Sequence, residues 1–406
     1  MKTPFIIAVL LLATPWARAE PGVRQISQDM LPLTITQPGC YRVVAPLSFA
    51  GLTNGVSIQA NGVTIDLNGF TFVGPGSSSG HGIHQGSAYR DAEVRNGTVR
   101  NWQGAVSFGV HLEGVNNRVV GVRAIGCGSG IFVGDNSRVE SCVVSGISST
   151  DFGYGISAGQ GSGVELCVVH DGDSDIVMTG IFLGEGASAR RCVVRDLNAS
   201  PVVYGIAGEG RNIAERCAVG SLQGNDGAAG IQLADGGEVR QCSVQGVSAA
   251  TAAGGSQGIY GNGVRVEQCA VYGCGGSSTN GAGIYLFRNG VARENAVRGN
   301  RYSGIEAYQD NLVSRNVSGL NGNGSDGAAG VEVTGEGNRI EENHLVLNHY
   351  GVRDAATNSF FMRNSLHANT QAGSVASTNH MPDSLLRPGP DFNALATPYN
   401  FQDVIW

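Results

Sequence analysis

The chain has 406 residues, and its 63 glycines are about twice the usual share. Charged residues make up 15 % and apolar residues 41 %, a balance that argues against intrinsic disorder. The glycines lack the period of three that collagen requires. The formal net charge of −7 argues against nucleic-acid binding, which needs a basic surface.

Residues 1–19 have the pattern of a secretory signal peptide. Lys2 gives a positive start, Phe5 to Ala13 an apolar stretch, and Ala17-Arg18-Ala19 a small-residue cleavage site. The apolar stretch is too short to cross ~30 Å of hydrocarbon, and no later stretch is long enough. We therefore expect cleavage after Ala19, no membrane span, and a secreted or periplasmic protein.

A repeat runs through most of the chain. Cys142, Cys167, Cys192, Cys217 and Cys242 are spaced 25 residues apart, and Cys269 follows after 27. Beyond Cys269 the same position holds asparagine, and before Cys142 it holds Val122 and Gly97. The asparagines are Asn295, Asn316, Asn343 and Asn364.

A second marker, Gly followed by Ile or Val, recurs every 21–28 residues at twelve positions: Gly82, Gly109, Gly130, Gly155, Gly180, Gly205, Gly230, Gly258, Gly283, Gly304, Gly330 and Gly351. The residues between the markers alternate as in short β-strands, with Gly, Asn, Asp and Ser at the breaks and no helical period. We therefore predict an all-β, single-stranded right-handed parallel β-helix, a solenoid of about twelve turns, over residues 51–370. Residues 20–50 are expected to cap its N-terminal end, and residues 371–406 to form a C-terminal cap or tail.

Three stretches resemble secreted right-handed parallel β-helix proteins of the pectate-lyase-like superfamily. They begin with Thr34-Ile-Thr-Gln-Pro-Gly-Cys-Tyr, Gly62-Val-Thr-Ile-Asp-Leu-Asn-Gly and Val94-Arg-Asn-Gly-Thr-Val. The resemblance implies the fold but no single activity, because the superfamily includes lyases, hydrolases, epimerases and members with no known reaction. Polygalacturonase-like members carry several activity motifs, of which this chain has only Gly80-His81-Gly82, near its start. The Asp-Pro-His run of epimerase-like members is absent.

The cysteine column is interpreted as structural. An inward position repeated on adjacent turns stacks like on like, so the thiols form a buried column that the asparagines continue. Disulfides between neighbouring rungs are the alternative, although nine cysteines leave at least one thiol free.

If the Ile or Val of each marker points inward, the next residue points outward. Read along the rod, this outward ladder is His84, His111, Phe132, Ser157, Phe182, Ala207, Gln232, Tyr260, Tyr285, Glu306, Glu332 and Arg353. Aromatic rings stack on sugar faces, and paired carboxylates serve as acid and base on glycosidic bonds. We therefore predict Glu306, Glu332 and Arg353 as catalytic, and the substrate-binding residues as Phe132, Phe182, Tyr260, Tyr285 and Tyr350. The alternative is a solvated face on which Arg353 only balances Glu332.

Two cation sites are considered. We expect His81, His84 and His111 to cluster, because two of them lie on neighbouring turns, and imidazole is a metal ligand. Several loop aspartates suit calcium or are simply solvated. These aspartates are Asp151, Asp171, Asp173, Asp175, Asp196 and Asp226.

Three functions follow as hypotheses, and the third of them is metal handling at His81, His84 and His111. The first is a monomeric protein that binds an extracellular polysaccharide and cleaves or modifies it, as a lyase or glycoside hydrolase. The second is a non-catalytic carbohydrate-binding or cell-surface structural β-helix. The acidic charge favours a neutral glycan, because a polyuronate needs calcium to bridge like charges.

Overall fold

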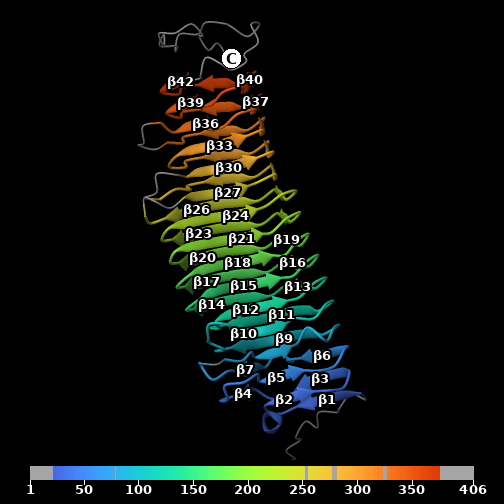
Figure 1. Cartoon of the computed structure of the whole chain (residues 1–406). Helices are drawn as coiled ribbons and strands as arrows, with labels where there is room; N and C mark the ends of the chain where they lie inside the picture. The colour runs from blue at the N-terminus through green and yellow to red at the C-terminus, as the bar shows by residue number, and fades with distance from the viewer. Residues whose placement is uncertain (1–21, 78, 252–254, 277–280, 323–326, 375–406) are drawn as a thin grey trace, which may run out of the picture.

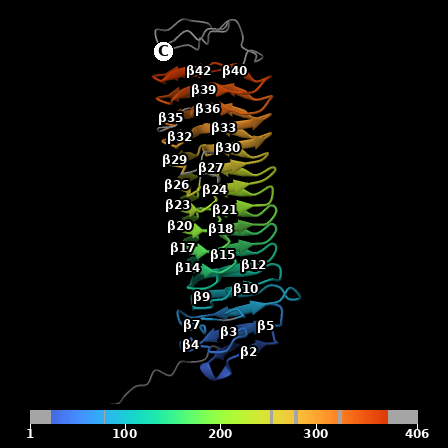
Figure 2. The ribbon, with the colours of Figure 1, turned by 60° about the vertical axis from the view of Figure 1, so that its left-hand side comes forward.

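The computed structural model describes residues 22–77, 79–251, 255–276, 281–322 and 327–374. The strands stack as successive rungs of an elongated rod, with the N-terminal and C-terminal turns at opposite ends (Figures 1 and 2). The predicted signal peptide and nearly all of segment 371–406 lie outside the described residues.

The outward ladder lies on a parallel sheet of fifteen strands, one from each turn. These strands are β2 (Leu33–Ile35), β5 (Val56–Ile58), β8 (Ile83–Gln85), β10 (Phe108–Leu112), β12 (Ser129–Val133), β15 (Phe152–Ala158), β18 (Val177–Leu183), β21 (Val202–Gly208), β24 (Gly227–Leu233), β27 (Ser256–Gly261), β30 (Ala282–Arg288), β33 (Ser303–Gln309), β36 (Ala329–Val333), β39 (Tyr350–Asp354) and β42 (Gln371–Ser374).

A second parallel sheet of 27 strands forms two arms that meet at a corner. The first arm contains β1 (Val23–Ile26), β3 (Gly39–Val43), β6 (Val63–Asp66), β13 (Arg138–Glu140), β16 (Gly163–Glu165), β19 (Ser188–Arg190), β22 (Ile213–Glu215), β25 (Glu238–Arg240), β28 (Arg265–Glu267), β31 (Val291–Arg293), β34 (Leu312–Ser314), β37 (Arg339–Glu341) and β40 (Phe360–Met362). The second arm contains β4 (Leu47–Ser48), β7 (Thr71–Val73), β14 (Val143–Ser149), β17 (Val168–Ser174), β20 (Val193–Ala199), β23 (Ala218–Gly224), β26 (Ser243–Ala249), β29 (Ala270–Tyr272), β32 (Ala296–Arg298), β35 (Val317–Gly319), β38 (His344–Val346) and β41 (Ser365–His367). β9 (Glu93–Arg100) and β11 (Arg118–Ile125) run through both arms.

The predicted all-β parallel solenoid is confirmed. The twelve Gly-Ile or Gly-Val markers lie at strands β8 to β39, and β2, β5 and β42 extend the same sheet. Strands β1 to β4 pair in register with the next turn, so part of segment 20–50 belongs to the parallel stack. Within the described residues the one helix is the 3-10 helix η1 (Gln28–Met30), and none is long and apolar enough to cross a membrane.

The corner between the two arms is a single residue in the left-handed conformation. It precedes each cysteine or asparagine of the column, as at Ser141, Leu166 and Arg191, whose φ angles are 53° to 54°. A left-handed side-chain-bearing residue costs roughly 1–2 kcal/mol. The buried contacts on both sides of the corner must offset that cost in every turn.

At most markers the glycine is required by packing and not by its φ angle. A Cβ on Gly155 would lie 2.4 Å from Val169 Cγ1 on β17 and 2.4 Å from the carbonyl oxygen of Gly180 on the next rung. Any side chain at this position would therefore push the 15-stranded sheet away from the second arm.

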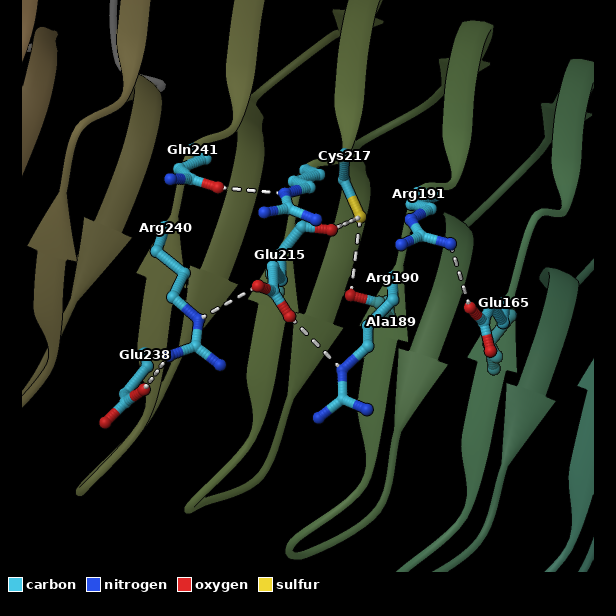
Figure 3. A network of polar contacts seen from close by, with 12 residues as sticks. Glu165, Ala189, Arg190, Arg191, Glu215, Cys217, Glu238, Arg240 and Gln241 are labelled. Atoms are coloured by element: carbon cyan, nitrogen blue, oxygen red, sulfur yellow. Dashed lines mark hydrogen bonds and ion pairs between the residues drawn. The ribbon is translucent and has the colours of Figure 1, made fainter.

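The predicted thiol column is present, and the structure has no disulfide among its nine cysteines. Each Sγ of the column lies against backbone carbonyls; that of Cys217 is 3.4 Å from the carbonyl oxygens of Ala189 and Glu215 (Figure 3). On the solvent side of the same strands, Glu215 pairs with both Arg190 and Arg240, at 3.4 and 3.5 Å. Successive turns of the first arm are therefore joined by thiol–carbonyl contacts on the inside and by ion pairs on the outside.

The asparagine column continues the thiols as predicted. Asn316 Oδ1 accepts hydrogen bonds from the backbone N–H of Asn295 at 2.9 Å and from its Nδ2 at 3.0 Å, and Asn316 Nδ2 donates to the Ala292 carbonyl at 2.9 Å. A second asparagine column, which the sequence analysis missed, lies five residues further along each turn. Its members are Asn300, Asn321, Asn348 and Asn369.

We expect thiol labelling of the native protein to modify one cysteine, Cys40, because it is exposed while the other eight are buried. Burial also raises the pKa of Cys127 and Cys274 to about 12, which removes the reactive thiolate. Labelling with a chromogenic disulfide reagent should give one thiol in buffer and nine in denaturant. Fewer than nine in denaturant without reductant would show a disulfide and contradict the free column.

Asn316→Ala should lower the free energy of unfolding by about 3 kcal/mol, because it leaves two buried donors of Asn295 without acceptors. Urea denaturation followed by circular dichroism measures the change. The matched control is Gln241→Ala, whose side chain bonds only to exposed neighbours, and which should change stability by less than about 0.5 kcal/mol. Equal effects of the two substitutions would contradict a stabilising role for the column.

Candidate functional site

The outward ladder is one continuous column on the 15-stranded sheet. Each of its twelve residues is the register partner of the next, from His84 opposite His111 to Glu332 opposite Arg353. The predicted alignment is therefore confirmed. Most of its side chains are partly buried, and Ser157 and Ala207 are buried.

Phe132 and Phe182 stand on either side of Ser157, the small residue on the rung between them. A hollow of about 300 Å³ opens there, and Asp135, Glu185 and Glu209 line its edge. Two aromatic walls two rungs apart leave room for a flat ring between them. The carboxylates at the edge favour a neutral or cationic occupant.

Tyr260 and Tyr285 form the second aromatic part of the ladder. Their rings stack with centroids 5.4 Å apart and planes inclined by 20°. Tyr285 is the register partner of Glu306, and its pKa is raised to about 12 by burial and then by the charge of Glu306. The tyrosine hydroxyl next to the carboxyl pair therefore remains protonated at neutral pH and can donate a hydrogen bond.

Glu306 and Glu332 occupy adjacent rungs of β33 and β36 and have different surroundings. Glu332 forms an ion pair with Arg353 Nη1 at 3.1 Å and accepts a hydrogen bond from the Ser303 hydroxyl. Glu306 has only a long hydrogen bond from the Thr334 hydroxyl, 3.4 Å, to its Oε1. The cation of the group is thus placed on one carboxylate of the pair.

This asymmetry separates the two carboxyl groups chemically. Burial, and then the charge of Glu332, raises the pKa of Glu306 to about 7. Two neighbouring carboxyl groups, one protonated near neutral pH and one paired with a cation, are what acid–base chemistry at a glycosidic bond requires.

Arg353 is held in place as well as paired. Its Nη1 donates to the Gly327 carbonyl oxygen at 2.8 Å in addition to contacting Glu332. An arginine engaged in this way is a poor proton acceptor, so the geometry favours a positioning role for Arg353 over the catalytic role predicted from the sequence.

Tyr350 lies outside the ladder. It pairs in register with Ala329, three residues before Arg353, and its ring packs edge-on against His349 at 4.8 Å. The register therefore separates Tyr350 from the column of Tyr260 and Tyr285, and its role in substrate binding stays a prediction.

Sequence reasoning missed a second aromatic pair beside the carboxyl groups. Phe287 and Tyr308 stack with centroids 5.1 Å apart and planes inclined by 4°. Each lies two residues after a ladder residue, Tyr285 or Glu306, and so faces the same side of the strand. The period of two could have revealed the pair if the outward positions had been read beyond one column. No pattern in the sequence indicated that Ser303 and Thr334 would hydrogen-bond to the two carboxyl groups.

The three histidines of the predicted metal site are brought together. The ring centroids of His81 and His111 are 4.2 Å apart, and those of His84 and His111 are 5.6 Å apart. Burial lowers the pKa of His81 to about 3 and that of His111 to about 4. Both imidazoles are therefore neutral at physiological pH.

The loop aspartates are not brought together in this way. Asp171 and Asp196 take left-handed positions inside β17 and β20, with φ of 55°, so placing them in free loops was wrong. In the described part of the chain, the three histidines are the one group of at least three potential ligands that lies close enough to hold an ion.

No family model matches the chain, and no curated protein matches it. Solved structures resemble its fold. The A-module of the mannuronan C-5 epimerase AlgE4 of Azotobacter vinelandii is 14 % identical, covers 85 % of this chain and 91 % of its own, and has a TM-score of 0.45. The tailspike protein of E. coli bacteriophage HK620, in complex with a pentasaccharide, is 16 % identical, covers 82 % and 72 %, and has a TM-score of 0.46. At these identities the likeness concerns the fold alone.

The raised pKa of Glu306 predicts a pH-dependent stability. The folded protein binds this proton more tightly than the unfolded chain does, so the free energy of unfolding falls as pH rises from about 4.5 to about 7. In the variant Glu306→Gln the side chain does not titrate, so this fall in the free energy of unfolding is absent. The variant's stability relative to the wild type should rise across that window by up to about 3 kcal/mol.

Urea denaturation at several pH values between 4.5 and 7.5 measures the difference. Glu238→Gln is the control, because Glu238 is a partly exposed carboxylate of the first arm, paired with Arg240. A stability difference between Glu306→Gln and the wild type that stays constant over this pH range would contradict the shifted pKa.

Proposed function

We propose that the protein binds a neutral polysaccharide along the outward ladder and hydrolyses a glycosidic bond at Glu306 and Glu332. The observation that carries the proposal is the asymmetry of the carboxyl pair. Glu306 holds its proton up to about pH 7, while Glu332 is paired with Arg353. We also propose that the chain is exported, on the pattern of residues 1–19.

Each carboxyl group has one role. Glu306 donates its proton to the leaving-group oxygen, and the Glu332 carboxylate acts on the opposite side as nucleophile or as the base for a water molecule. The Tyr285 hydroxyl lies beside Glu306 and is suited to bond the sugar ring at the cleaved position. Arg353 and Ser303 orient Glu332.

The aromatic residues bind the rest of the glycan. Tyr260 and Tyr285 offer a stacked pair next to the carboxyl groups, and Phe132 and Phe182 offer a separate position further along the rod. Carboxylates at both places repel a polyuronate, so a neutral chain is the substrate class that the charges favour.

A lyase mechanism has less support. It needs a free base near the carbon that loses its proton, and the arginine of this group is already engaged by Glu332 and the Gly327 carbonyl. Hydrolysis uses both carboxyl groups in the states that the structure gives them.

Incubation with neutral and acidic polysaccharides, followed by reducing-end release and by absorbance of unsaturated products, tests the activity. Glu306→Gln and Glu332→Gln should each reduce hydrolysis at least about 100-fold, and Glu238→Gln should leave it unchanged. For the wild type, kcat/KM should fall above about pH 7, where Glu306 loses its proton.

A substrate with a strongly acidic leaving group needs little proton donation. The activity of Glu306→Gln should therefore be restored in large part with a dinitrophenyl glycoside of the same sugar, whereas that of Glu332→Gln should not. Binding without turnover, weakened about tenfold by Tyr285→Ala, would overturn the hydrolase proposal in favour of a non-catalytic carbohydrate-binding protein.

A further inference from the structure

The histidine group near the N-terminal end of the ladder is a site of its own. His84 on β8 and His111 on β10 are register partners, and His81 lies just before β8. His111 is eight rungs away from Glu306, which corresponds to about 38 Å of sheet. The proposed hydrolysis therefore makes no use of these residues.

A carboxylate faces two of the imidazoles. Glu113 Oε1 lies 3.7 Å from His84 Nε2 and 3.6 Å from His111 Nδ1. Ligand atoms around a tetrahedral ion of the zinc class are separated by about 3.3–3.5 Å, so both distances to Glu113 Oε1 are close to that spacing. The side chain of Glu113 is 39 % exposed, which leaves a path from solvent.

One potential metal-ligand atom of the group, a ring nitrogen, has no hydrogen-bond partner. His111 Nδ1 is buried and unbonded, although the histidine side chain around it is 13 % exposed. A buried polar atom without a partner costs free energy. A cation between His111 and Glu113 would satisfy it.

The third imidazole, His81, lies close to the other two. One ligand atom from each of His81, His84 and His111 lies within 4.8 Å of the others. The rings are nearly parallel, with planes inclined by 11° to 15°, and His81 Nδ1 accepts a hydrogen bond from the Phe108 N–H at 3.0 Å. Ion binding therefore requires the rings to turn about their Cβ–Cγ bonds and His81 to release that hydrogen bond.

We propose that His81, His84 and His111, with Glu113 beside them, bind one divalent transition-metal ion of the zinc class. A ligand set of three imidazoles and one carboxylate binds zinc or copper(II) in preference to calcium or magnesium.

The competing explanation is a purely structural aromatic stack. His111 packs against Phe108 and Phe132, with centroids 4.9 and 4.7 Å apart. His111→Phe separates the two explanations, because phenylalanine keeps the ring packing and removes the donor nitrogen.

Titration of the tag-free protein with Zn²⁺ by calorimetry tests the site. We expect one ion per chain, with affinity at least tenfold weaker in His84→Gln and in His111→Phe, and about tenfold weaker in Glu113→Gln. The control His344→Gln changes an exposed histidine of the second arm, near Ser365, and should bind as the wild type does. Circular dichroism shows whether each variant is folded.

A second readout identifies the ligands directly. Co²⁺ bound in place of Zn²⁺ should give the intense visible absorption of a four-coordinate site, and His81→Phe should weaken it. Absence of stoichiometric binding, or binding that persists when all three histidines are replaced, would overturn the proposal. Glu306→Gln and Glu332→Gln should bind the ion unchanged, so a failure of the hydrolase proposal leaves this result readable.

Discussion

In-register parallel stacking is the constraint on which the rest of this structure depends. Each turn hydrogen-bonds to the turns before and after it, residue for residue, at the spacing of neighbouring strands, about 4.8 Å. Every position therefore becomes a column, and a residue that suits one turn must also suit its own neighbours. Valine and isoleucine pack well in such columns. A side chain in place of Gly155 does not, because its Cβ would meet Val169 at 2.4 Å.

Polar residues enter the interior only where the column satisfies them. Thiols lie against carbonyl oxygens of the turn before, and an asparagine amide such as that of Asn316 bonds to the next asparagine and to a carbonyl oxygen. The columns also hold the left-handed corner residues that precede them, including Leu166 and Arg191, which have no intrinsic preference for that conformation. The same repetition thus provides core packing, hydrogen bonding and the turning of the chain.

On the outward face, stacking brings together groups that repel one another when charged. At one end of the ladder, burial keeps His81 and His111 neutral. At the other end, Arg353 and Ser303 bind Glu332, while burial keeps the proton on Glu306. The two ends resolve the same like-charge problem differently. One end keeps neutral imidazoles, to which we assign the proposed metal ion, and the other keeps a protonated carboxyl, to which we assign the proposed acid catalysis.

The sequence alone determined the solenoid, the cysteine and asparagine column and the outward ladder, because a fixed repeat converts spacing along the chain directly into register. It did not reveal the left-handed corners, since Ser141 and Arg191 carry no local signal for them, or the second asparagine column. Nor did it reveal which side chains meet across turns. Ser303 hydrogen-bonds to Glu332 and Thr334 to Glu306, and Glu113 faces the histidines. These contacts depend on side-chain directions, which the spacing of residues along the chain does not encode. The pKa of Glu306 was decided by tertiary structure as well, because its main cause is burial, and burial depends on how the neighbouring turns cover the side chain.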